Sequence, residues 1–297
     1  MNKFVAIYQN DISLFIKRDD LIHPIISGNK FRKLKYNLIE AKNQKKITLL
    51  TFGGAFSNHI LAVSAAGKEY GFDTIGIIRG EELEDKIETN PTLQKAKEFG
   101  MVFDFISREE YRNKNNPEFL KMLKQKFGDF YLIPEGGTNE FAIKGCEEIL
   151  KENDTDFDFI CCSVGTGGTI SGIINSSKEN QKVLGFPALK GDFLQEDIRK
   201  FAKKNNWQLI TDYHFGGYAK YDATLIEFIN NFYEKHQIPL DPIYTSKMVF
   251  GVLDLIEKEY FPPKSKILVI HTGGLQGING INAILKQKNL TEINIDV

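Results

Sequence analysis

Four cationic side chains crowd into six positions of the stretch SGNKFRKLKY, residues 27–36, directly after a Gly-Asn pair. A lysine amine can form a Schiff base with an aldehyde when a desolvated setting lowers its pKa. Lys30 is the candidate, because it stands after the flexible Gly28, where an extended segment gives way to a helix. Lys33 and Lys35 lie farther into that helix, and Lys35 should project from another face. Taken alone, the stretch is also typical of a solvated basic helix.

A glycine-rich turn at SVGTGGTISG, residues 163–172, has the composition of a phosphate site. We expect a hydrophobic strand to run into this turn and a helix to start within it. Backbone N–H groups at a helix N-terminus, with hydroxyls beside them and glycines that permit close approach, suit an anion. The residues of this cradle are Gly165, Thr166, Gly167, Gly168 and Thr169. The alternative is an ordinary tight turn between a strand and a helix.

The spacing of the glycines narrows the kind of phosphate. A dinucleotide fingerprint needs GxGxxG, but Ile170 breaks that spacing, and the next strand, KVLGFP, supplies no acid for a ribose. A GxxxxGK loop for a triphosphate is absent from the sequence. A phosphate monoester therefore fits best, and a phosphate cradle combined with a reactive lysine is what pyridoxal phosphate requires. The sequence thus predicts this cofactor, with Lys30 as its Schiff-base partner.

Short apolar, β-rich runs alternate with segments of helical period, which predicts an α/β fold of mostly parallel sheet flanked by helices. The expected strands are 13–18, 47–52, 73–79, 101–106, 130–134, 157–164, 182–187, 207–211 and 266–271. Glycines and small polar residues follow four of them, and ligand sites of such sheets lie at the carboxyl ends of strands. A helix is expected between two strands, with Asn90 as its cap, Pro91 in its first turn and Gly100 at its end.

Bulk composition limits the partners. The chain has 297 residues, of which 38 are basic and 39 acidic, so its formal net charge is −1 and we expect no nucleic-acid binding. Cys146, Cys161 and Cys162 lack metal-type spacing, so we expect neither a disulfide framework nor a metal site. No apolar run reaches the roughly 20 residues of a membrane span, and the N-terminus lacks a signal-peptide pattern. We therefore expect a cytoplasmic protein without membrane partners.

Six stretches occur in an order that resembles the 1-aminocyclopropane-1-carboxylate deaminase/D-cysteine desulfhydrase family. They are RDDLIHPIISGNKFRKLKYNL, GGAFSNHILAVSAAGKEYG, SVGTGGTISGII, DYHFGGYAKYD, LDPIYTSKMVFGVLDLI and IHTGGLQGI, and they cover nearly the whole chain. The combination of GNKxRKLxY with SNH and YTxK is specific, whereas the glycine loops alone are not. The resemblance implies a fold-type II, tryptophan synthase beta-like enzyme that depends on pyridoxal phosphate and forms a homodimer.

The resemblance also assigns roles to individual residues. It implies that Lys30 holds the cofactor and, once substrate displaces it, moves a proton at the substrate's α-carbon. Asn58 matches the asparagine that hydrogen-bonds the cofactor's O3′, and Ser57 matches a reactive serine near the substrate carboxylate. Without the resemblance, Ser57 is a helix N-cap, and a histidine or tyrosine is ordinarily a packing residue. The other side chains that match the substrate pocket are His59, Tyr218 and Tyr244.

Two threonines bear on which branch of the family the sequence resembles. Thr245 and Thr272 fall where the family approaches the cofactor's pyridine nitrogen. Deaminases that open the cyclopropane ring typically carry a glutamate directly after the tyrosine at position 244, whereas desulfhydrases carry a threonine, as here. His59 also resembles the desulfhydrases, because the deaminases usually have glutamine at its place.

The sequence therefore predicts two α/β domains: a smaller one at 35–140, and a larger cofactor-binding one made of 1–34 and 141–297. We expect the active site in the cleft between them. The favoured reaction is α,β-elimination from a small amino acid such as D-cysteine, giving pyruvate, ammonia and sulfide. The alternative is deamination of 1-aminocyclopropane-1-carboxylate to 2-oxobutanoate and ammonia. A racemase or another amino-acid lyase, a nicotinamide oxidoreductase, and a catalytically silent ligand-binding protein are further alternatives.

Overall fold

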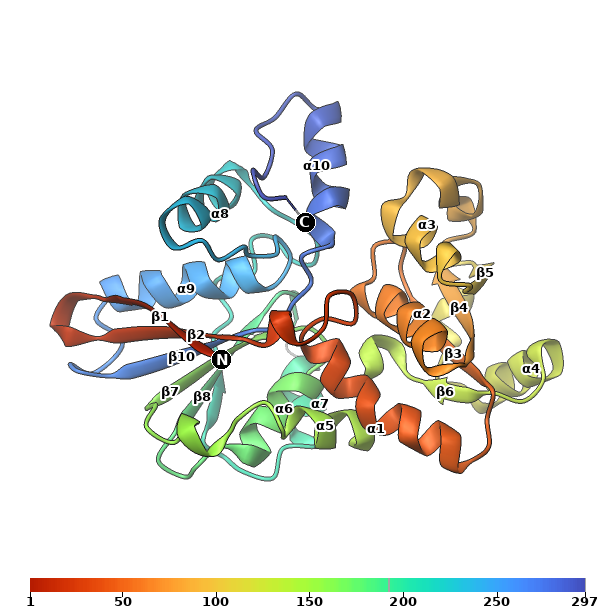
Figure 1. Ribbon diagram of the computed structural model, residues 1–297, viewed down its shortest axis with the longest axis horizontal. Coiled ribbons are helices and arrows are strands. Elements are labelled where there is room, and N and C mark those ends of the chain that lie inside the picture. The colour runs from red at the N-terminus through yellow and green to blue at the C-terminus, as the bar shows by residue number, and fades with distance from the viewer. Residues whose placement is uncertain (192, 297) are drawn as a thin grey trace.

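The computed structural model describes residues 1–191 and 193–296 of the chain. It has an α/β fold with two separate sheets, each flanked by helices, as the sequence predicts (Figure 1). The larger sheet has six strands in the order β1-β2-β10-β7-β8-β9, and the smaller has four in the order β5-β4-β3-β6. Every strand pair of the described residues is parallel except β1 with β2.

The bounds of the elements are as follows. The larger sheet consists of β1 (Asn2–Ile7), β2 (Ser13–Arg18), β7 (Phe159–Val164), β8 (Lys182–Pro187), β9 (Trp207–Leu209) and β10 (Lys266–His271). The smaller sheet consists of β3 (Thr48–Gly53), β4 (Asp73–Arg79), β5 (Val102–Ile106) and β6 (Tyr131–Ile133). The helices are α1 (Asn29–Asn43), α2 (Asn58–Tyr70), α3 (Pro91–Glu98), α4 (Pro117–Phe127), α5 (Glu140–Cys146), α6 (Gly168–Ser176), α7 (Phe193–Arg199), α8 (Ala223–His236), α9 (Thr245–Glu257) and α10 (Gly277–Gln287). Among the described residues, no helix has the length and apolar character that crossing a bilayer would need.

The nine expected strands correspond to β2 through β10, with ends that differ by two residues at most. β1 was not expected. It is an edge strand, antiparallel to β2, and most of its side chains face solvent at least in part. An edge strand that buries little apolar surface carries little hydrophobic signal, which is why the sequence pattern does not reveal it. The expected helix after Asn90 is α3, and the Asn90 side chain accepts hydrogen bonds from Thr92 N and Leu93 N.

The central strands of both sheets are buried, as parallel sheets covered by helices require. In β7 the adjacent Cys161 and Cys162 are fully buried, one against the core on each face of the sheet. Burial raises the pKa of both thiols, so they remain protonated and act as small apolar side chains. All three cysteines of the chain are free and buried.

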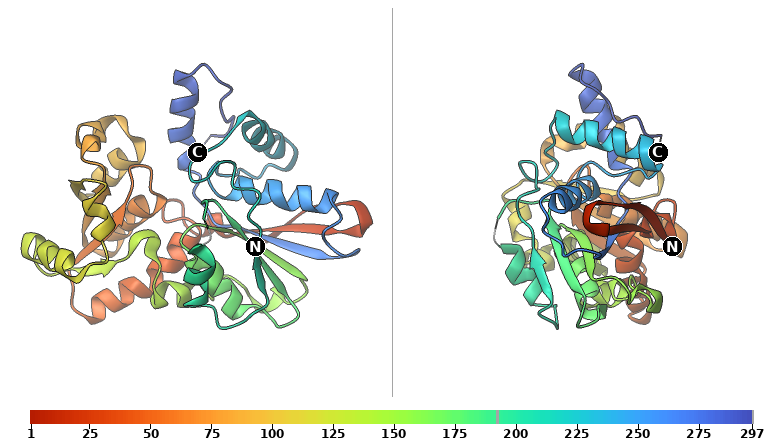
Figure 2. Two further views of the ribbon diagram at one scale, coloured as in Figure 1. Left: turned by 180° about the vertical axis from the view of Figure 1, so that it is seen from behind. Right: turned by 90° about the vertical axis from the view of Figure 1, so that its left-hand side faces the viewer.

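Helix α1 connects the two halves of the fold. It begins near the centre of the molecule and runs outward past the smaller sheet, packed against α5 and α2 (Figures 1 and 2). All strands of the smaller sheet lie between residues 48 and 133, and those of the larger sheet lie in 2–18 and 159–271. The predicted boundary at 34/35 falls inside α1, so one continuous helix passes from one predicted domain to the other. The domain boundaries stay a prediction.

Candidate active site

Loops at the carboxyl ends of strands from both sheets contact one another around the first turn of α1. Lys33 of α1 bonds to Gly136, which follows β6, and reaches Thr166, which follows β7. Asn58, which follows β3, lies against Gly274, which follows β10: a Cβ added to Gly274 would be 2.8 Å from Asn58 Nδ2. The glycine-rich loops singled out in the sequence therefore converge on one place.

The backbone before Lys30 is held in a conformation that only glycine adopts readily. Gly28 has φ of +59°, and a Cβ there would lie 2.0 Å from the carbonyl oxygen of Thr272. Asn29 then anchors the first turn of α1, because its backbone N–H donates to that same carbonyl at 3.1 Å. Its side chain donates to Thr169 Oγ1 in the glycine-rich turn at 2.8 Å. The start of α1 thus docks on both the end of β10 and the predicted phosphate cradle.

Lys30 has the properties that a Schiff-base lysine needs. Burial and, to a smaller extent, the nearby charge of Lys33 lower its pKa to about 7, while Cys146 and Asp241 act in the opposite direction. Among the described residues its Nζ has one hydrogen-bond partner, Oδ1 of the adjacent Asn29 at 3.1 Å. At neutral pH a large fraction of the Lys30 amine is therefore unprotonated and able to act as a nucleophile or a base.

Three other lysines are buried, but their amines are engaged. Lys17 Nζ pairs with Asp154 at 2.6 Å. Lys33 Nζ donates to Gly136 O at 2.9 Å and to Thr138 Oγ1 at 3.1 Å, and Lys247 Nζ donates to two backbone carbonyls. Lys35, the remaining lysine of the stretch, pairs with Glu148 at the surface at 2.7 Å, so it projects away from the site as expected. Contacts thus single out Lys30 as the least restrained buried amine.

The glycine-rich turn and Lys33 together form an anion cradle. Gly167 caps α6 with φ of +82°, and α6 begins at Gly168. A Cβ at Gly168 would lie 2.8 Å from Thr138 Oγ1 and 3.2 Å from Lys33 Nζ, so only glycine leaves room there. The hydroxyls of Thr138 and Thr166 are 2.6 Å apart beside the same amine. Helix N–H groups, two hydroxyls and a cation within this space suit a phosphate.

The first turn of α2 carries Ser57, Asn58 and His59. Ser57 is the N-cap, and its Oγ accepts from the N–H groups of His59 and Ile60, both at 3.3 Å. Because Oγ only accepts in these bonds, its own proton remains free to be donated. The N-cap role of Ser57 is therefore compatible with a role near a substrate.

His59 is neutral, and its hydrogen bonds fix its tautomer. Burial lowers its pKa well below 6.5, and the positive charges of Lys30 and Lys33 lower it further. Thr51 Oγ1 donates its one proton to Ile133 O at 2.8 Å and must therefore accept from His59 Nε2, also at 2.8 Å. Nδ1 is then left as a buried acceptor without a partner among the described residues.

The tyrosine pair and Thr245 lie at the start of α9. Tyr244 is its N-cap residue, and the rings of Tyr244 and Tyr218 meet edge to face with centroids 6.1 Å apart. Burial raises the pKa of the Tyr244 phenol well above its ordinary value, and partial burial raises that of Tyr218, which keeps 39% of its surface exposed. Both phenols therefore stay protonated at neutral pH. The carboxylate of the fully buried Asp241 accepts from the backbone N–H groups of Tyr244 and Thr245 at 2.8 Å, which orders this turn.

Two buried polar atoms without partners test whether the site suits the predicted cofactor. Asn58 Oδ1 and Thr245 Oγ1 have no hydrogen-bond partner among the described residues. Thr272 Oγ1 lies 3.3 Å from Ser163 Oγ. Orphaned polar atoms are rare in protein interiors, and they indicate a missing partner. A ring that carries a hydroxyl and a nitrogen would supply one, so the residues fit pyridoxal phosphate.

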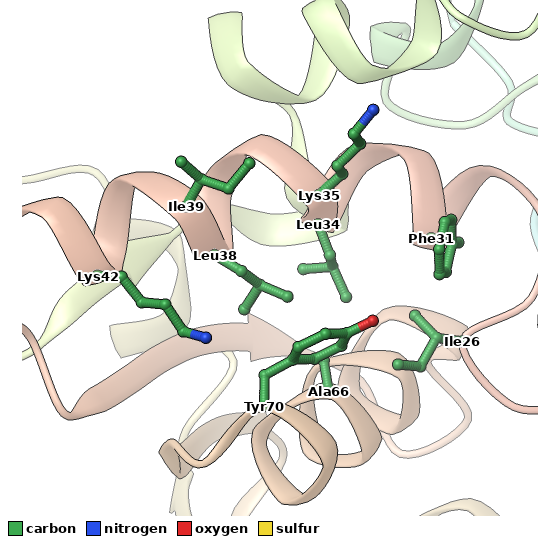
Figure 3. A pocket seen from close by; sticks show the side chains of 9 residues that line it. All are labelled: Ile26, Phe31, Leu34, Lys35, Leu38, Ile39, Lys42, Ala66 and Tyr70. Carbon is green, nitrogen blue, oxygen red and sulfur yellow. The ribbon is translucent and has the colours of Figure 1, made fainter.

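An apolar groove elsewhere is separate from this site. It lies between α1 and α2, has a volume of about 240 Å³ and is lined largely by aliphatic and aromatic side chains (Figure 3). The lining residues are Ile26, Phe31, Leu34, Lys35, Leu38, Ile39, Lys42, Ala66 and Tyr70. None of them is a residue of the candidate active site, so the groove contributes no chemistry there.

A family model described as pyridoxal-phosphate-dependent enzyme matches residues 2–273. The chain belongs to this family. The cofactor predicted from the glycine turn and Lys30 is therefore confirmed as the cofactor of this pyridoxal-phosphate-dependent enzyme. When bound, it supplies an electron sink at the carbon next to the substrate's amino group.

Two curated relatives and one solved structure agree with the resemblance seen in the sequence. A putative 1-aminocyclopropane-1-carboxylate deaminase from Pyrococcus furiosus is 32% identical over 89% of this chain and 85% of its own length. A mitochondrial protein from Arabidopsis thaliana, named a bifunctional D-cysteine desulfhydrase/1-aminocyclopropane-1-carboxylate deaminase, is 32% identical over 91% of this chain and 74% of its own. The crystal structure of an ACC deaminase homologue superposes with a TM-score of 0.84 at 27% identity, covering 97% and 93% of the two chains.

Several residues at the site of this pyridoxal-phosphate-dependent enzyme were not predicted from the sequence. Lys33 and Thr138 complete the anion cradle, and Asp241 orders the turn that carries Tyr244. Lys33 left a usable signal, because it stands three residues after Lys30 and therefore on the same face of the helix. For Thr138 and Asp241, the spacing of residues in the sequence gives no signal that would identify them as site residues.

Proposed function

We propose that this enzyme eliminates the β-substituent of a small amino acid, with D-cysteine favoured. D-Cysteine and water give pyruvate, ammonia and hydrogen sulfide. The α-carbon loses a proton, the bond between the β-carbon and sulfur breaks, and the sulfur leaves with its electron pair. Water then replaces nitrogen at the α-carbon. Family membership and the names of the two curated relatives support a lyase or deaminase of this class.

Lys30 is proposed as the lysine that holds the cofactor and, when released, as the base at the α-carbon. With a pKa of about 7, its amine accepts a proton readily and returns it readily at neutral pH. The anion cradle is proposed to hold the cofactor phosphate through Thr166, Thr169 and Lys33. The other proposed phosphate-binding residues are Gly165, Gly167 and Gly168.

The start of α2 and the tyrosine pair are proposed to bind and orient the substrate. The free proton of Ser57 suits a substrate carboxylate, and Asn58 suits the cofactor's O3′. Tyr218 and Tyr244 remain protonated and can donate a proton toward a departing group. His59 offers Nδ1 as an acceptor, which no group in the described part of the chain contacts by a hydrogen bond.

The observation that carries the choice of elimination is the neutral hydroxyl of Thr245, which has no hydrogen-bond partner among the residues that the structure describes. It is fully buried, and the nearest carboxylate of that turn, Asp241, is already used by backbone N–H groups. A hydroxyl does not hold a ring nitrogen protonated as a carboxylate would, so the electron sink is weaker. Loss of a thiolate needs less stabilisation of negative charge by the cofactor than breaking a carbon–carbon bond does. Thr272 is proposed to assist at the same nitrogen.

Ring-opening deamination is the second candidate. Both curated relatives carry 1-aminocyclopropane-1-carboxylate deaminase in their names, one of them as putative. In this reaction water and the cyclopropane amino acid give 2-oxobutanoate and ammonia. The adjacent phenols of Tyr218 and Tyr244 would suit protonation of the ring carbon that is released.

The experiment that decides between the two measures keto-acid products. The purified enzyme is given D-cysteine, L-cysteine, D-serine or 1-aminocyclopropane-1-carboxylate, and pyruvate and 2-oxobutanoate are quantified. We expect pyruvate from D-cysteine above all. Activity confined to the cyclopropane substrate would overturn the weight placed on Thr245. The Lys30→Ala variant should lose both turnover and yellow colour.

We further propose a cytoplasmic homodimer built from a smaller domain at 35–140 and a larger one at 1–34 and 141–297. The separate chain ranges of the two sheets support the division into domains. The family resemblance alone supports the dimer. Light scattering on the eluting holoenzyme tests it, and a monomer mass would contradict it.

A further inference from the structure

Lys247 is a buried cation for which the proposed chemistry has no use. It lies in α9, three residues after Tyr244, and only 2% of its surface is exposed. Its Nζ donates to His214 O at 2.9 Å and to Gly217 O at 2.8 Å. Burying a lysine is unfavourable unless its amine gains specific partners, so these two contacts need an explanation.

Both carbonyls belong to an irregular segment, residues 211–222, between β9 and α8. The segment turns repeatedly through left-handed backbone conformations, with φ of +51° at Phe215, +87° at Gly216 and +54° at Ala219. For residues other than glycine such conformations are unfavourable by roughly 1 kcal/mol each. A segment of this kind keeps one shape only where contacts from outside impose it.

Lys247 joins two successive turns of that segment. His214 O also accepts from Gly217 N at 3.0 Å, and Gly217 O also accepts from Lys220 N at 3.2 Å. Each turn is closed by its own backbone bond, and the single amine of Lys247 ties both turns to α9. On the other side Phe215 packs edge to face on Phe250 of α9, with ring centroids 5.1 Å apart.

Tyr218 directly follows Gly217, whose carbonyl Lys247 binds. Its ring lies against the ring of Tyr244, which α9 places from its own N-terminus. Helix α9 thus contacts both tyrosines. Tyr244 is its N-cap residue, and Lys247 of the same helix binds the carbonyl of the residue before Tyr218. We propose that Lys247 is a positioning residue that fixes Tyr218 in the active site. The proposal rests on the substrate role proposed for Tyr218.

The charge environment agrees with this role. Burial lowers the pKa of Lys247 to about 8, and the carboxylates of Asp241 and Asp222 work in the opposite direction. The amine is charged or carries two N–H donors across the neutral range, so both carbonyls stay bonded. With its donors aimed at the loop, Lys247 is not available to hold the cofactor.

A double-mutant cycle tests the proposal. Lys247→Met keeps an unbranched apolar side chain that is one atom shorter and removes the amine donors, and Tyr218→Phe removes the phenol hydroxyl. If Lys247 acts through Tyr218, Lys247→Met lowers kcat/KM about 10- to 100-fold in the wild-type background and little further beside Tyr218→Phe. Equal losses in both backgrounds would overturn the proposal. Lys258→Met, at the exposed end of the same helix, is the matched control and should leave kcat/KM unchanged.

Hydrogen exchange on the holoenzyme provides an independent test of whether Lys247 orders residues 211–222. Lys247→Met should speed exchange in residues 211–222 and leave the body of α9 protected. An unchanged exchange rate in residues 211–222 would contradict the proposed role of Lys247. Should Tyr218→Phe keep full turnover, the role proposed for Tyr218 fails, and exchange alone then decides whether Lys247 orders the segment. If Lys247→Met does not fold, Lys247→Gln, which retains a shorter pair of donors, takes its place in both measurements.

Discussion

Replacing Lys30 with methionine should stabilise the apoprotein while abolishing its function. In the folded apoprotein the pKa of the Lys30 amine is about 7, against an ordinary value of 10.5. Each tenfold change in an ionisation equilibrium corresponds to about 1.4 kcal/mol, so the difference amounts to at most about 5 kcal/mol. The side chain is partly exposed, so water screens part of this, and we expect about 2 to 3 kcal/mol.

The pH dependence of this effect has a definite sign. Below pH 7 the Lys30 amine is protonated in both the folded and the unfolded chain, so the unfavourable burial of its charge destabilises the folded state in full. Between pH 7 and 10.5 the unfolded chain holds the proton and the folded chain does not, so the stability contribution of Lys30 rises with pH. The advantage of Lys30→Met should therefore be largest at pH 6 and shrink steadily toward pH 10.

Thermal unfolding of the cofactor-free proteins at pH 6, 7.5 and 9.5 measures this. We expect Lys30→Met to raise Tm by on the order of 5 °C at pH 6 and by much less at pH 9.5. Lys35→Met is the control, because Lys35 pairs with Glu148 at the surface and its loss should change Tm little at any of these pH values. A Lys30→Met protein that is no more stable than wild type at pH 6, or whose advantage is independent of pH, would refute the reasoning.

Three further predictions follow from individual contacts. Lys33→Met should weaken cofactor binding about 10- to 100-fold in a titration followed by visible absorbance, because the cradle loses its buried cation; unchanged affinity would remove Lys33 from the cradle. In a denaturation assay, Gly28→Ala should lower the free energy of unfolding by about 3 kcal/mol or more, because its Cβ would collide with a backbone carbonyl. The control Gly71→Ala has a positive φ but open space around it, so it should lower the free energy of unfolding by only about 1 kcal/mol. Nitrogen NMR of the His59 ring at pH 6.5 should show the neutral Nε2–H tautomer in the wild type and a mixture of tautomers in Thr51→Val. A protonation midpoint at or above pH 6.5 would contradict the lowered pKa, and an Nδ1–H tautomer would contradict the assigned hydrogen bonds.

The sheets were predictable because their strands are buried runs of apolar residues with glycine turns at their ends. β7 and β10 illustrate this: each is almost wholly buried, and each runs into a glycine-rich loop. β1 escaped prediction because it lies at an edge and buries little, so its sequence shows no clear pattern. Local signals also sufficed for Ser57 and Asn90, since an N-cap bonds to residues two and three positions away.

The site was predictable only in part, because its remaining contacts join distant segments. Lys33 meets Gly136 and Thr138, more than 100 residues away, and nothing in the spacing of one stretch reveals such partners. Asp241 acts on backbone N–H groups, which any sequence offers, so its type alone does not mark it. Lys247 belongs to the YTxK motif, but a motif does not say what an amine contacts, and only the fold shows that this amine is enclosed.

Reductive trapping tests the central claim most directly. Borohydride treatment of the yellow holoenzyme fixes the cofactor to the lysine that holds it, and peptide mass spectrometry then identifies that residue. Because Lys30 combines a pKa of about 7 with one hydrogen-bond partner among the described residues, we predict that the label lies on Lys30. A label on Lys33 or Lys247, or no covalent label, would contradict the account.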